Sequence, residues 1–520
     1  MTPDEIIQKI LETRGITNLD EYFNPPHPKD IESPFDSLPA IELIKKHIAL
    51  NNKIIVYGDY DVDGICATAI LWETIYAGYK NVFPHIPHRE SEGYGLSIKG
   101  IDHCLSQGAK LIITVDNGIV AHDQIGYIKN NACDVIIIDH HDPEQKLPNA
   151  NTILYSKDSC ASGLAWFFAR DYLGLSAKGQ VLSLELATIA TVCDLVPLLN
   201  INRSFARHGL AELENTKRVG LLALIQEASL KKIGVYEIGY IIGPRINAMG
   251  RLEHAIDSLR LLCTHNADQA AKLAKLLGDT NKTRQDETKN AVDHALGMLD
   301  ENNLPDLIVV SDTGYHAGVI GLIAGKLTEK YHRPSIAISV GETESKASCR
   351  SISGFHITDY LRKFDKLLVA VGGHAMAAGF TISSINLPKL LKKLNKTSID
   401  PKLLVKTQRI DLEIPLSSIN YELMTKLKTM EPYGLGNPQP IFKSANIQIT
   451  NIKSVGQTGK HLKFKVGNLD AIWFNATSSQ LLSPSSSYDV IYQSEINEFN
   501  GKTSLQLNIR DIIAHGSDTL

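Results

Sequence analysis

The sequence predicts an α/β protein in which a parallel-sheet domain is followed by a helical connector, a smaller α/β domain and a C-terminal β-barrel. Short β-branched runs alternate with helical stretches between about residues 53 and 200, which is typical of βαβ units. Strand-like runs are sparse from about 205 to 300, and a second αβ pattern starts at 307. After about 441 the pattern contains only short strands.

The composition agrees with several folded domains. At roughly 150 residues per domain, 520 residues correspond to about three or four domains. The 53 basic and 57 acidic residues give a formal net charge of −4, which excludes a globally basic nucleic-acid binder but not a local basic channel. The seven scattered cysteines contain no CxxC pair, so they indicate neither a disulfide framework nor a zinc-thiolate site. With no membrane-length apolar run and no signal peptide, the expected location is the cytoplasm.

The parallel-sheet domain is expected to span residues 51–210, after an N-terminal segment at 1–50. Nearly every residue in its clearest strands is apolar, as expected for strands that are covered by helices on both faces. These strands are predicted at 53–57, 111–115 and 134–138.

The next two regions differ in their apolar spacing. Residues 211–302 show mostly helical spacing and are expected to form the helical connector. Residues 303–388 are expected to form the smaller α/β domain with its own sheet. Its element-like runs lie at 307–310, 320–327, 336–340 and 367–371.

The last part of the chain begins with a basic segment. Seven Lys or Arg residues lie between Lys389 and Arg409, against the single Asp400, so 389–440 is predicted to be a linker. Five short strands then suggest an OB-like barrel over 441–520, and the Asn500-Gly501 pair predicts a hairpin between the last two. An open sheet packed on its neighbour is the alternative for this block.

Polar residues follow each of the three clearest strands. The segments are 58–64 (GDYDVDG), 116–118 (DNG) and 139–142 (DHHD). Because the carboxyl ends of parallel strands meet at one edge of a sheet, we expect these side chains to converge on one crevice. Asp and Gly are also common turn residues and helix N-caps, so one segment alone would not indicate a site. The three together do.

Clustered carboxylates repel one another unless a cation lies among them. A mixture of Asp and His ligands without Cys suits Mn²⁺ or Mg²⁺ better than structural Zn²⁺. Asp194 is a further candidate, because it interrupts an apolar helical stretch at 182–198, where a buried carboxylate is costly without a metal or a basic partner. The alternative is a residue at the end of the helix whose side chain reaches solvent before Pro197.

These segments, with ATVCDLVPL at 190–198, resemble the four motifs of the DHH phosphoesterase superfamily in order and approximate spacing. The segments 243–251 (GPRINAMGR), 348–351 (SCRS) and 372–379 (GGHAMAAG) are similar to the RecJ branch and its DHH-associated domain, so the resemblance covers nearly the whole chain. It implies a metal-dependent exonuclease that degrades single-stranded DNA from the 5′ end in DNA recombination and repair, with an OB domain at the C-terminal end.

The resemblance also implies roles for individual residues. Asp116, His140 and His141 are the candidate catalytic residues, and Asp59 and Asp139 would lie just behind the ligands or face the phosphate. Two ions, Mn²⁺ or Mg²⁺, can activate a water and neutralise the leaving oxygen, so no nucleophilic side chain is required. The implied metal ligands, with Asp116 bridging the two ions, are Asp61, Asp63, Asp116, His140 and Asp194. One departure lies at 142–148, where the family usually has a Gly after the Pro; it concerns the shape of the loop.

A second set of residues is expected to contact phosphate or DNA. Arg presents paired donors to phosphate oxygens, and Gly lets the backbone approach a strand closely. A solvated Arg and a tight Gly turn are the structural alternatives. We expect Arg89 to meet Ser348 and Arg350 across the cleft at a terminal 5′-phosphate. The full set is Arg89, Arg245, Arg251, Ser348, Arg350, Gly372, Gly373 and His374.

Two other functions remain open from the sequence. One is a DHH phosphodiesterase that acts on oligoribonucleotides or cyclic dinucleotides, for which the added C-terminal domain is a poor argument. The other is a non-catalytic DNA-binding scaffold, which would be expected to have lost carboxylates. The expected partner is single-stranded DNA, with single-strand-binding protein as a candidate; we expect no membrane contact and a monomer. Aromatic residues in the C-terminal block are expected to be barrel core more often than base-stacking surfaces.

Overall fold

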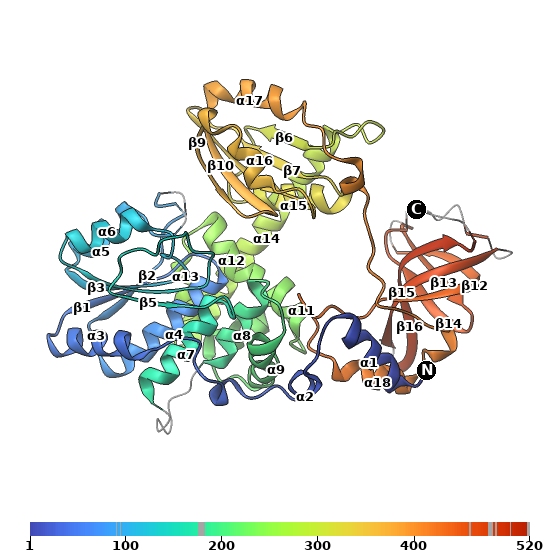
Figure 1. Cartoon of the computed structure of the whole chain (residues 1–520), viewed down its shortest axis with the longest axis horizontal. Coiled ribbons are helices and arrows are strands. Elements are labelled where there is room, and N and C mark those ends of the chain that lie inside the picture. The colour runs from blue at the N-terminus through green and yellow to red at the C-terminus, as the bar shows by residue number, and fades with distance from the viewer. Residues whose placement is uncertain are drawn as a thin grey trace.

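Three sheet-containing units make up the computed structural model in Figure 1. The first sheet lies at the left of the view, the smaller α/β domain lies above it, and the barrel lies at the right. The structure describes residues 1–520 apart from 90, 94, 175–182, 457–458, 477–481, 484–485, 500 and 517–520. None of the helices in these described ranges is long and apolar enough to cross a membrane.

The first sheet is entirely parallel, with the strand order β2-β1-β3-β4-β5. Alternate residues of β1 enter different cores, because Ile54 and Val56 face one layer of helices and Ile55 and Tyr57 face the other. This arrangement confirms the parallel-sheet domain. The strands are β1 (Lys53–Tyr57), β2 (Val82–His85), β3 (Ala109–Val115), β4 (Asp134–Asp139) and β5 (Thr152–Tyr155).

Helices cover both faces of this sheet. One layer contains α3 (Leu38–Ala49), α4 (Val62–Gly78), α7 (Ala161–Leu173) and α8 (Leu184–Cys193), and the other contains α5 (Ile98–Ser106) and α6 (His122–Asn130). The predicted helical connector extends the first layer, since its apolar residues join the same core. α9 (Asn200–Glu214) crosses the predicted boundary at 210. The helices that follow it are α10 (Val219–Glu227), α11 (Val235–Glu237), η2 (Ile238–Ile242), α12 (Gly243–Leu252), α13 (Ile256–Cys263) and α14 (Ala267–Gly297).

The long helix α14 leads into the smaller α/β domain (Figure 1). Its sheet has the order β6-β7-β8-β10-β9, in which only β6 and β7 are parallel. The elements are β6 (Ile308–Asp312), α15 (Ile320–Tyr331), β7 (Ser335–Ser339), β8 (Glu344–Arg350), α16 (Ile357–Arg362), β9 (Leu368–Gly373), β10 (Ala377–Ser383) and α17 (Leu387–Leu394).

The C-terminal strands close into a barrel, which confirms the OB-like prediction over the open sheet. The order is β12-β13-β14-β16-β15, and β15 pairs with β12 to complete the circle. Phe464, Trp473 and Tyr492 are buried in its core, whereas Phe474 is half exposed beside His461. β15 and β16 pair as predicted up to Phe499 and Lys502, and Asn500 lies outside the described residues. The strands are β12 (Phe442–Val455), β13 (His461–Val466), β14 (Leu469–Trp473), β15 (Ser487–Phe499) and β16 (Lys502–Ala514).

The segment 389–440 differs from the predicted linker, because both of its ends belong to neighbouring domains. Leu390 and Leu394 of α17 are buried in the core of the smaller α/β domain. Nearer the barrel, β11 (Leu412–Glu413) pairs with β12, and α18 (Tyr421–Thr429) packs on the barrel core. Three of the seven cations that suggested a linker, Lys389, Lys392 and Lys393, occupy the solvent side of α17, whose apolar residues recur at helical spacing.

The N-terminal segment 1–50 is divided between two distant parts of the fold. α3 packs on the first sheet, whereas the apolar face of α1 (Pro3–Thr13) packs against the barrel core and α18. α2 (Leu19–Phe23) follows, and its Tyr22 hydroxyl donates to Asn437 at 2.9 Å. Arg14 Nε lies 2.9 Å from Asp411 Oδ1, and both side chains are buried. The first residues are therefore a structural part of the C-terminal unit.

Candidate metal centre and phosphate cavity

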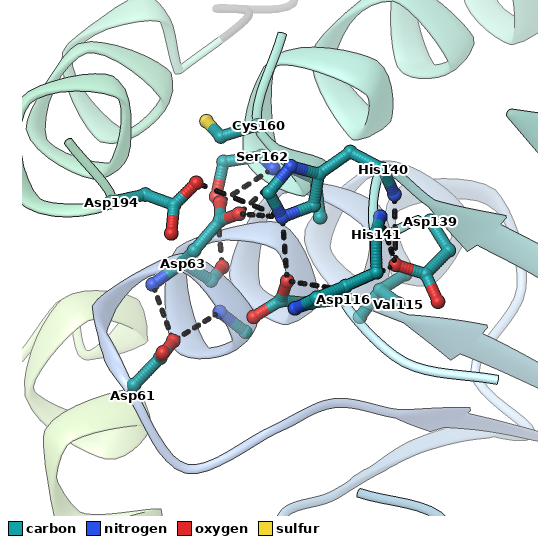
Figure 2. Close-up of polar contacts among 12 residues, drawn as sticks. Asp61, Asp63, Val115, Asp116, Asp139, His140, His141, Cys160, Ser162 and Asp194 are labelled. Carbon is teal, nitrogen blue, oxygen red and sulfur yellow. Dashed lines mark hydrogen bonds and ion pairs between the residues drawn. The ribbon is translucent and has the colours of Figure 1, made fainter. Parts of the chain in front are cut away.

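The residues that follow the parallel strands converge as predicted. Asp63 at the start of α4, Asp116 after β3, His140 after β4 and Asp194 at the end of α8 point toward one another in Figure 2. Groups of side-chain ligand atoms lie within 4.8 Å of one another in three sets: Asp116 with His140 and His141, Asp63 with His140 and Asp194, and Asp59 with Asp61 and Asp116.

His140 is the centre of this cluster. Its Nε2 atom lies 3.3 Å from Asp116 Oδ1, 3.6 Å from Asp194 Oδ2 and 3.7 Å from Asp63 Oδ2. The same atom is buried and makes no hydrogen bond to any residue that the structure describes. A ring nitrogen that faces several carboxylates at these separations leaves space for a cation among them, so the donor set fits a hard divalent ion.

Backbone groups fix two of the carboxylates. Asp61 caps α4 and accepts hydrogen bonds from the amides of Asp63 at 2.9 Å and Gly64 at 3.1 Å. Asp63 accepts from the amides of Ala161 and Ser162 at the start of α7, each at 2.7 Å. These contacts hold the carboxylates in place without a bound ion, so this part of the centre is preformed.

Asp116 has an unusual backbone conformation. Its φ of 62° lies in the left-handed region, which Asp adopts more readily than most residues. Its amide donates to Ile138 O of β4 at 3.0 Å, so the turn is fixed against the neighbouring strand. Strained backbone of this kind persists where the surrounding structure over-determines it, and here it directs Asp116 into the cluster.

The cluster has an excess of negative charge. Burial, followed by the charge of Asp61, raises the pKa of Asp59 to about 8. Burial, followed by Asp63 and Asp61, raises the pKa of Asp194 to about 9. The pKa values of Asp61 and Asp116 are raised for the same reasons, burial first and neighbouring carboxylates second. Bound cations would reverse this repulsion.

Asp139 and His141 form an ion pair beside the cluster. His141 Nδ1 lies 2.8 Å from Asp139 Oδ1, and Asp139 Oδ2 also accepts from the amide of Ile119 at 3.0 Å. Burial opposes both charges, but the pairing outweighs it: the pKa of Asp139 is lowered and that of His141 is raised to about 9. Asp139 therefore holds His141 beside the cluster.

A cavity of about 200 Å³ adjoins the carboxylates. Asp59 and Asp61 line one wall, Arg89 lies beside them, and Arg251 of α12 and Arg350 of β8 complete the lining with neighbouring residues that include Ser348. Burial, followed by the charges of Arg89, Arg284 and Arg350, lowers the pKa of Arg251 to about 10. The cavity therefore has an excess of positive charge, and an anion would relieve it.

The phosphate-contact candidates divide into two groups. Arg89, Arg251, Ser348 and Arg350 meet at the cavity, across the boundary between the two α/β domains. Arg245 instead lies 2.7 Å from Glu227 Oε2 and donates to Ile241 O at 3.0 Å, which is an internal ion pair.

The glycine-rich segment lies outside the cavity. Gly372, Gly373 and His374 are exposed, and Gly373 has a φ of 130° in the tight turn between β9 and β10, where a Cβ would lie 2.4 Å from Ala377 O. The close approach to Ala377 O gives Gly373 a structural reason to be glycine.

The sequence reasoning missed several residues of the site. Asn247 and Gly321 line the cavity, and Asn247 Oδ1 accepts from the amide of Val62 at 3.1 Å. Ser162 donates from its hydroxyl to Asp63 O at 2.8 Å, in addition to its amide contact. Asn247 lies inside the motif at 243–251, which could have identified it from the sequence. No sequence motif pointed to Ser162.

Three family models match separate parts of the chain. Residues 53–193 match the N-terminal domain of the DHH family, 305–398 match the DHHA1 domain, and 410–511 match the RecJ OB domain. The last range begins before β11, in agreement with the structured segment that precedes the barrel.

Relatives match nearly the full length of the chain. The single-stranded-DNA-specific exonuclease RecJ of Bacillus subtilis (strain 168) is 32% identical over 97% of this chain and 67% of its own length. The protein of the same name from Salmonella typhimurium is 31% identical over 91% of this chain and 89% of its own. The crystal structure of RecJ from Thermus thermophilus in complex with Mn²⁺ superposes with a TM-score of 0.85 and 26% identity, covering 98% of this chain and 76% of that one. The chain therefore belongs to the RecJ family of single-stranded-DNA-specific exonucleases.

Proposed function

We propose that this protein hydrolyses the phosphodiester bonds of single-stranded DNA from the 5′ end, with two divalent ions, Mn²⁺ or Mg²⁺. The observation that carries the proposal is the contact between two oppositely charged sites. The carboxylates Asp59 and Asp61 belong to the metal cluster and also line the cavity that contains Arg89 and Arg350. A phosphate in the cavity would therefore present its neighbouring phosphodiester bond to the ions.

The proposed ligands are Asp61, Asp63, Asp116, His140 and Asp194. Asp116 belongs to two of the three ligand sets, which supports its role as the bridge. When bound, the ions supply Lewis-acid activation of a water and charge neutralisation at the leaving oxygen. Asp139 holds the ring of His141, and the positive charge that this pairing favours suits a hydrogen bond to a non-bridging phosphate oxygen.

The cavity provides an argument for the polarity of the reaction. Its volume of about 200 Å³ is enough for a phosphate group. A terminal phosphate carries more charge and more free oxygens than an internal diester, so paired guanidinium donors and the Ser348 hydroxyl favour it. We propose that Arg89, Ser348 and Arg350 bind the 5′-phosphate and that Arg251 supports them.

The decisive experiment uses strands that are blocked at one end. The purified protein is incubated with Mn²⁺ and with single-stranded DNA that carries a block at the 5′ end, at the 3′ end or at neither. We expect the 5′ block to stop degradation and the 3′ block to leave it unchanged, and chelation to abolish both reactions. Degradation that only a 3′ block prevents would contradict the proposed polarity.

The same assay separates the alternative substrates. Oligoribonucleotides and cyclic dinucleotides serve as competing substrates, and a higher kcat/KM for either would favour the other DHH phosphodiesterase function. A non-catalytic scaffold would bind DNA without cleaving it. All five proposed ligands are present. Asp63, Asp116 and Asp194 lie near His140, and Asp61 lies near Asp116, which favours an enzyme.

We further propose that the protein acts in the cytoplasm, as a monomer, during DNA recombination and repair. Single-strand-binding protein is a candidate partner, because it would cover the same substrate. Light scattering at several concentrations tests the monomer, and cleavage of DNA precoated with single-strand-binding protein tests the partnership.

A further inference from the structure

An exposed pair of tyrosines lies on the helix that leads to the cavity. Tyr236 and Tyr240 are 64% and 71% exposed, their ring centroids are 4.9 Å apart and their planes differ by 27°. A pair of aromatic residues four positions apart contributes little to the stability of a helix. Large rings with this much exposed apolar surface indicate a contact that is completed by something else.

The helix joins this pair to the proposed phosphate site. α11, η2 and α12 form one unbroken helical run from Val235 to Leu252. Asn247 and Arg251 lie on α12, at the far end of this run from the tyrosines, and both line the phosphate cavity. From Tyr240 to Arg251 the rise of about 1.5 Å per residue gives about 16 Å. That length corresponds to roughly five stacked nucleotides at ~3.4 Å each.

The helix is held tightly beside the metal centre. A Cβ on Gly243 would lie 2.4 Å from Cys193 Sγ, and Cys193 directly precedes Asp194. The backbone forms a wide turn here, in which the amide of Gly243 donates to Ile238 O, five residues back. Such turns occur frequently at functional sites, and this one displays Tyr240 on the exposed side.

A large cavity lies between the tyrosines and the barrel. Its volume is about 870 Å³, and its lining joins Tyr236 and Tyr240 to Gln493 and Arg510 on β15 and β16. Its charged lining residues balance one another, since three cations face three carboxylates: Arg207, Lys232 and Arg510 with Glu214, Glu237 and Glu431. A ligand with flat apolar faces fits this surface better than one recognised by its charge.

We propose that Tyr236 and Tyr240 stack on bases of the DNA strand whose 5′ end occupies the cavity at Arg251 and Arg350. This inference rests on the proposed function. The strand runs from the cavity along the helix, and its bases reach the larger cavity between the tyrosines and the barrel. Because every base has an aromatic face, the contact is independent of sequence.

Binding measurements without metal test the stacking directly. Fluorescence anisotropy of a labelled single strand of about 20 nucleotides gives Kd for the full chain in EDTA, where no cleavage occurs. Replacing both residues (Tyr236→Ala with Tyr240→Ala) should raise Kd by about 5- to 150-fold, the range that the loss of one stacked base produces. The double Phe variant keeps the rings and should bind as the wild type does.

Two controls separate stacking from other effects. Tyr76 also stacks on an aromatic neighbour, Trp72, but lies 14 positions after the first residue of α4, about 21 Å from the metal edge, so Tyr76→Ala should leave Kd unchanged. The slope of log K against log salt should stay constant in the tyrosine variants, whereas loss of a phosphate contact would reduce it by about 0.7. A changed slope would overturn the stacking assignment.

A second experiment needs no variant and so does not depend on folding. Single strands with abasic sites about four to six nucleotides from the 5′ phosphate should bind the wild-type protein more weakly, and strands with abasic sites near the 3′ end should not. Equal affinity for both strands, or equal Kd for wild type and the double Ala variant, would overturn the inference. Because both assays measure binding, a failure to detect cleavage would count against the proposed function and not against the stacking.

Discussion

The metal cluster and the phosphate cavity share Asp59 and Asp61, but they carry opposite excess charges. In the cluster, burial and like charge raise the pKa of Asp194 to about 9. In the cavity, burial and like charge lower the pKa of Arg251 to about 10. The carboxylates of one site favour cations and the guanidinium groups of the other favour an anion, so ions and a DNA phosphate together would neutralise both.

The two sites also differ in how they are assembled. Every proposed metal ligand lies in the first α/β domain, where backbone amides hold Asp61 and Asp63. The cavity instead requires Ser348 and Arg350 from the smaller domain, which α14 connects to the rest. Metal binding should therefore be a property of one domain, whereas recognition of a chain end should depend on how the two domains meet.

The largest effect should follow from removing the bridging carboxylate. Asp116→Asn keeps a residue that tolerates the left-handed backbone at this position. We expect kcat/KM to fall by about 10³-fold or more, equivalent to several kcal/mol of lost transition-state stabilisation. The melting temperature of the metal-free protein should rise by a few degrees, because a buried like charge is removed. Wild-type cleavage in Mn²⁺ would refute the bridging role.

The pH dependence of stability should show the charge excess of the cluster. The pKa values of Asp59 and Asp194 rise from an ordinary 3.8 to about 8 and about 9, so the folded state binds protons that the unfolded state releases. Stability of the metal-free protein should therefore fall as pH rises through this window, by on the order of several kcal/mol. His141 acts in the same direction, because its raised pKa contributes stability that is lost as pH approaches about 9.

Urea unfolding between pH 5 and pH 8 measures this dependence, with and without Mn²⁺. We expect bound Mn²⁺ to flatten the curve, and Asp194→Asn to flatten part of it without metal. If the free energy of unfolding of the metal-free protein stayed constant or rose from pH 5 to pH 8, repulsion among the buried carboxylates would not be destabilising the fold.

A smaller effect should come from the cavity. We expect Arg350→Ala to reduce the preference for 5′-phosphorylated over 5′-hydroxyl strands by about 10- to 100-fold, since hydrogen bonds to charged groups contribute ~1.5–3 kcal/mol. Mn²⁺ affinity should not change, because Arg350 lies in the other domain. Arg350→Lys should be intermediate, as it keeps the charge without the paired donors. An unchanged ratio of kcat/KM values would remove Arg350 from the recognition of the chain end.

The smallest expected effect tests whether Arg245 contributes to DNA binding. Because Arg245 is paired with Glu227, we expect Arg245→Ala to lower the free energy of unfolding by about 1 kcal/mol and to leave DNA affinity nearly unchanged. Glu227→Gln serves as the matched variant. A salt slope reduced by about 0.7 with unchanged stability would return Arg245 to the DNA-binding set.

The convergence of the side chains that follow the parallel strands was predictable from the sequence, because its signals are local. Strands such as 53–57 and 134–138 are recognisable from their apolar runs, and parallel pairing then brings the residues that follow them to one edge. Asp194 was ambiguous between a ligand and the end of a helix. It caps α8, and its Oδ2 lies 3.6 Å from His140 Nε2 with its side chain 25% exposed, so the two interpretations are compatible.

Long-range packing was not predictable in this way. The positive charge of the segment 389–440 concealed the apolar faces of α17 and α18, which are recognisable as faces only at helical spacing. Likewise, no local pattern could show that Arg245 pairs with Glu227 or that α1 packs on the barrel. These contacts depend on which surfaces the tertiary fold brings together.

The position of α1 imposes an order on folding during synthesis. Arg14, at the end of α1, pairs with Asp411, 397 residues later in the chain. At about 5–20 residues per second, the ribosome needs on the order of 20–80 s to make that intervening length. Until then Ile6, Ile7, Ile10 and Leu11 of the helix lack the barrel core that buries them in the folded protein. The core of the barrel is thus completed by a helix that was translated long before the barrel itself. The two can pack together only after both have been synthesised.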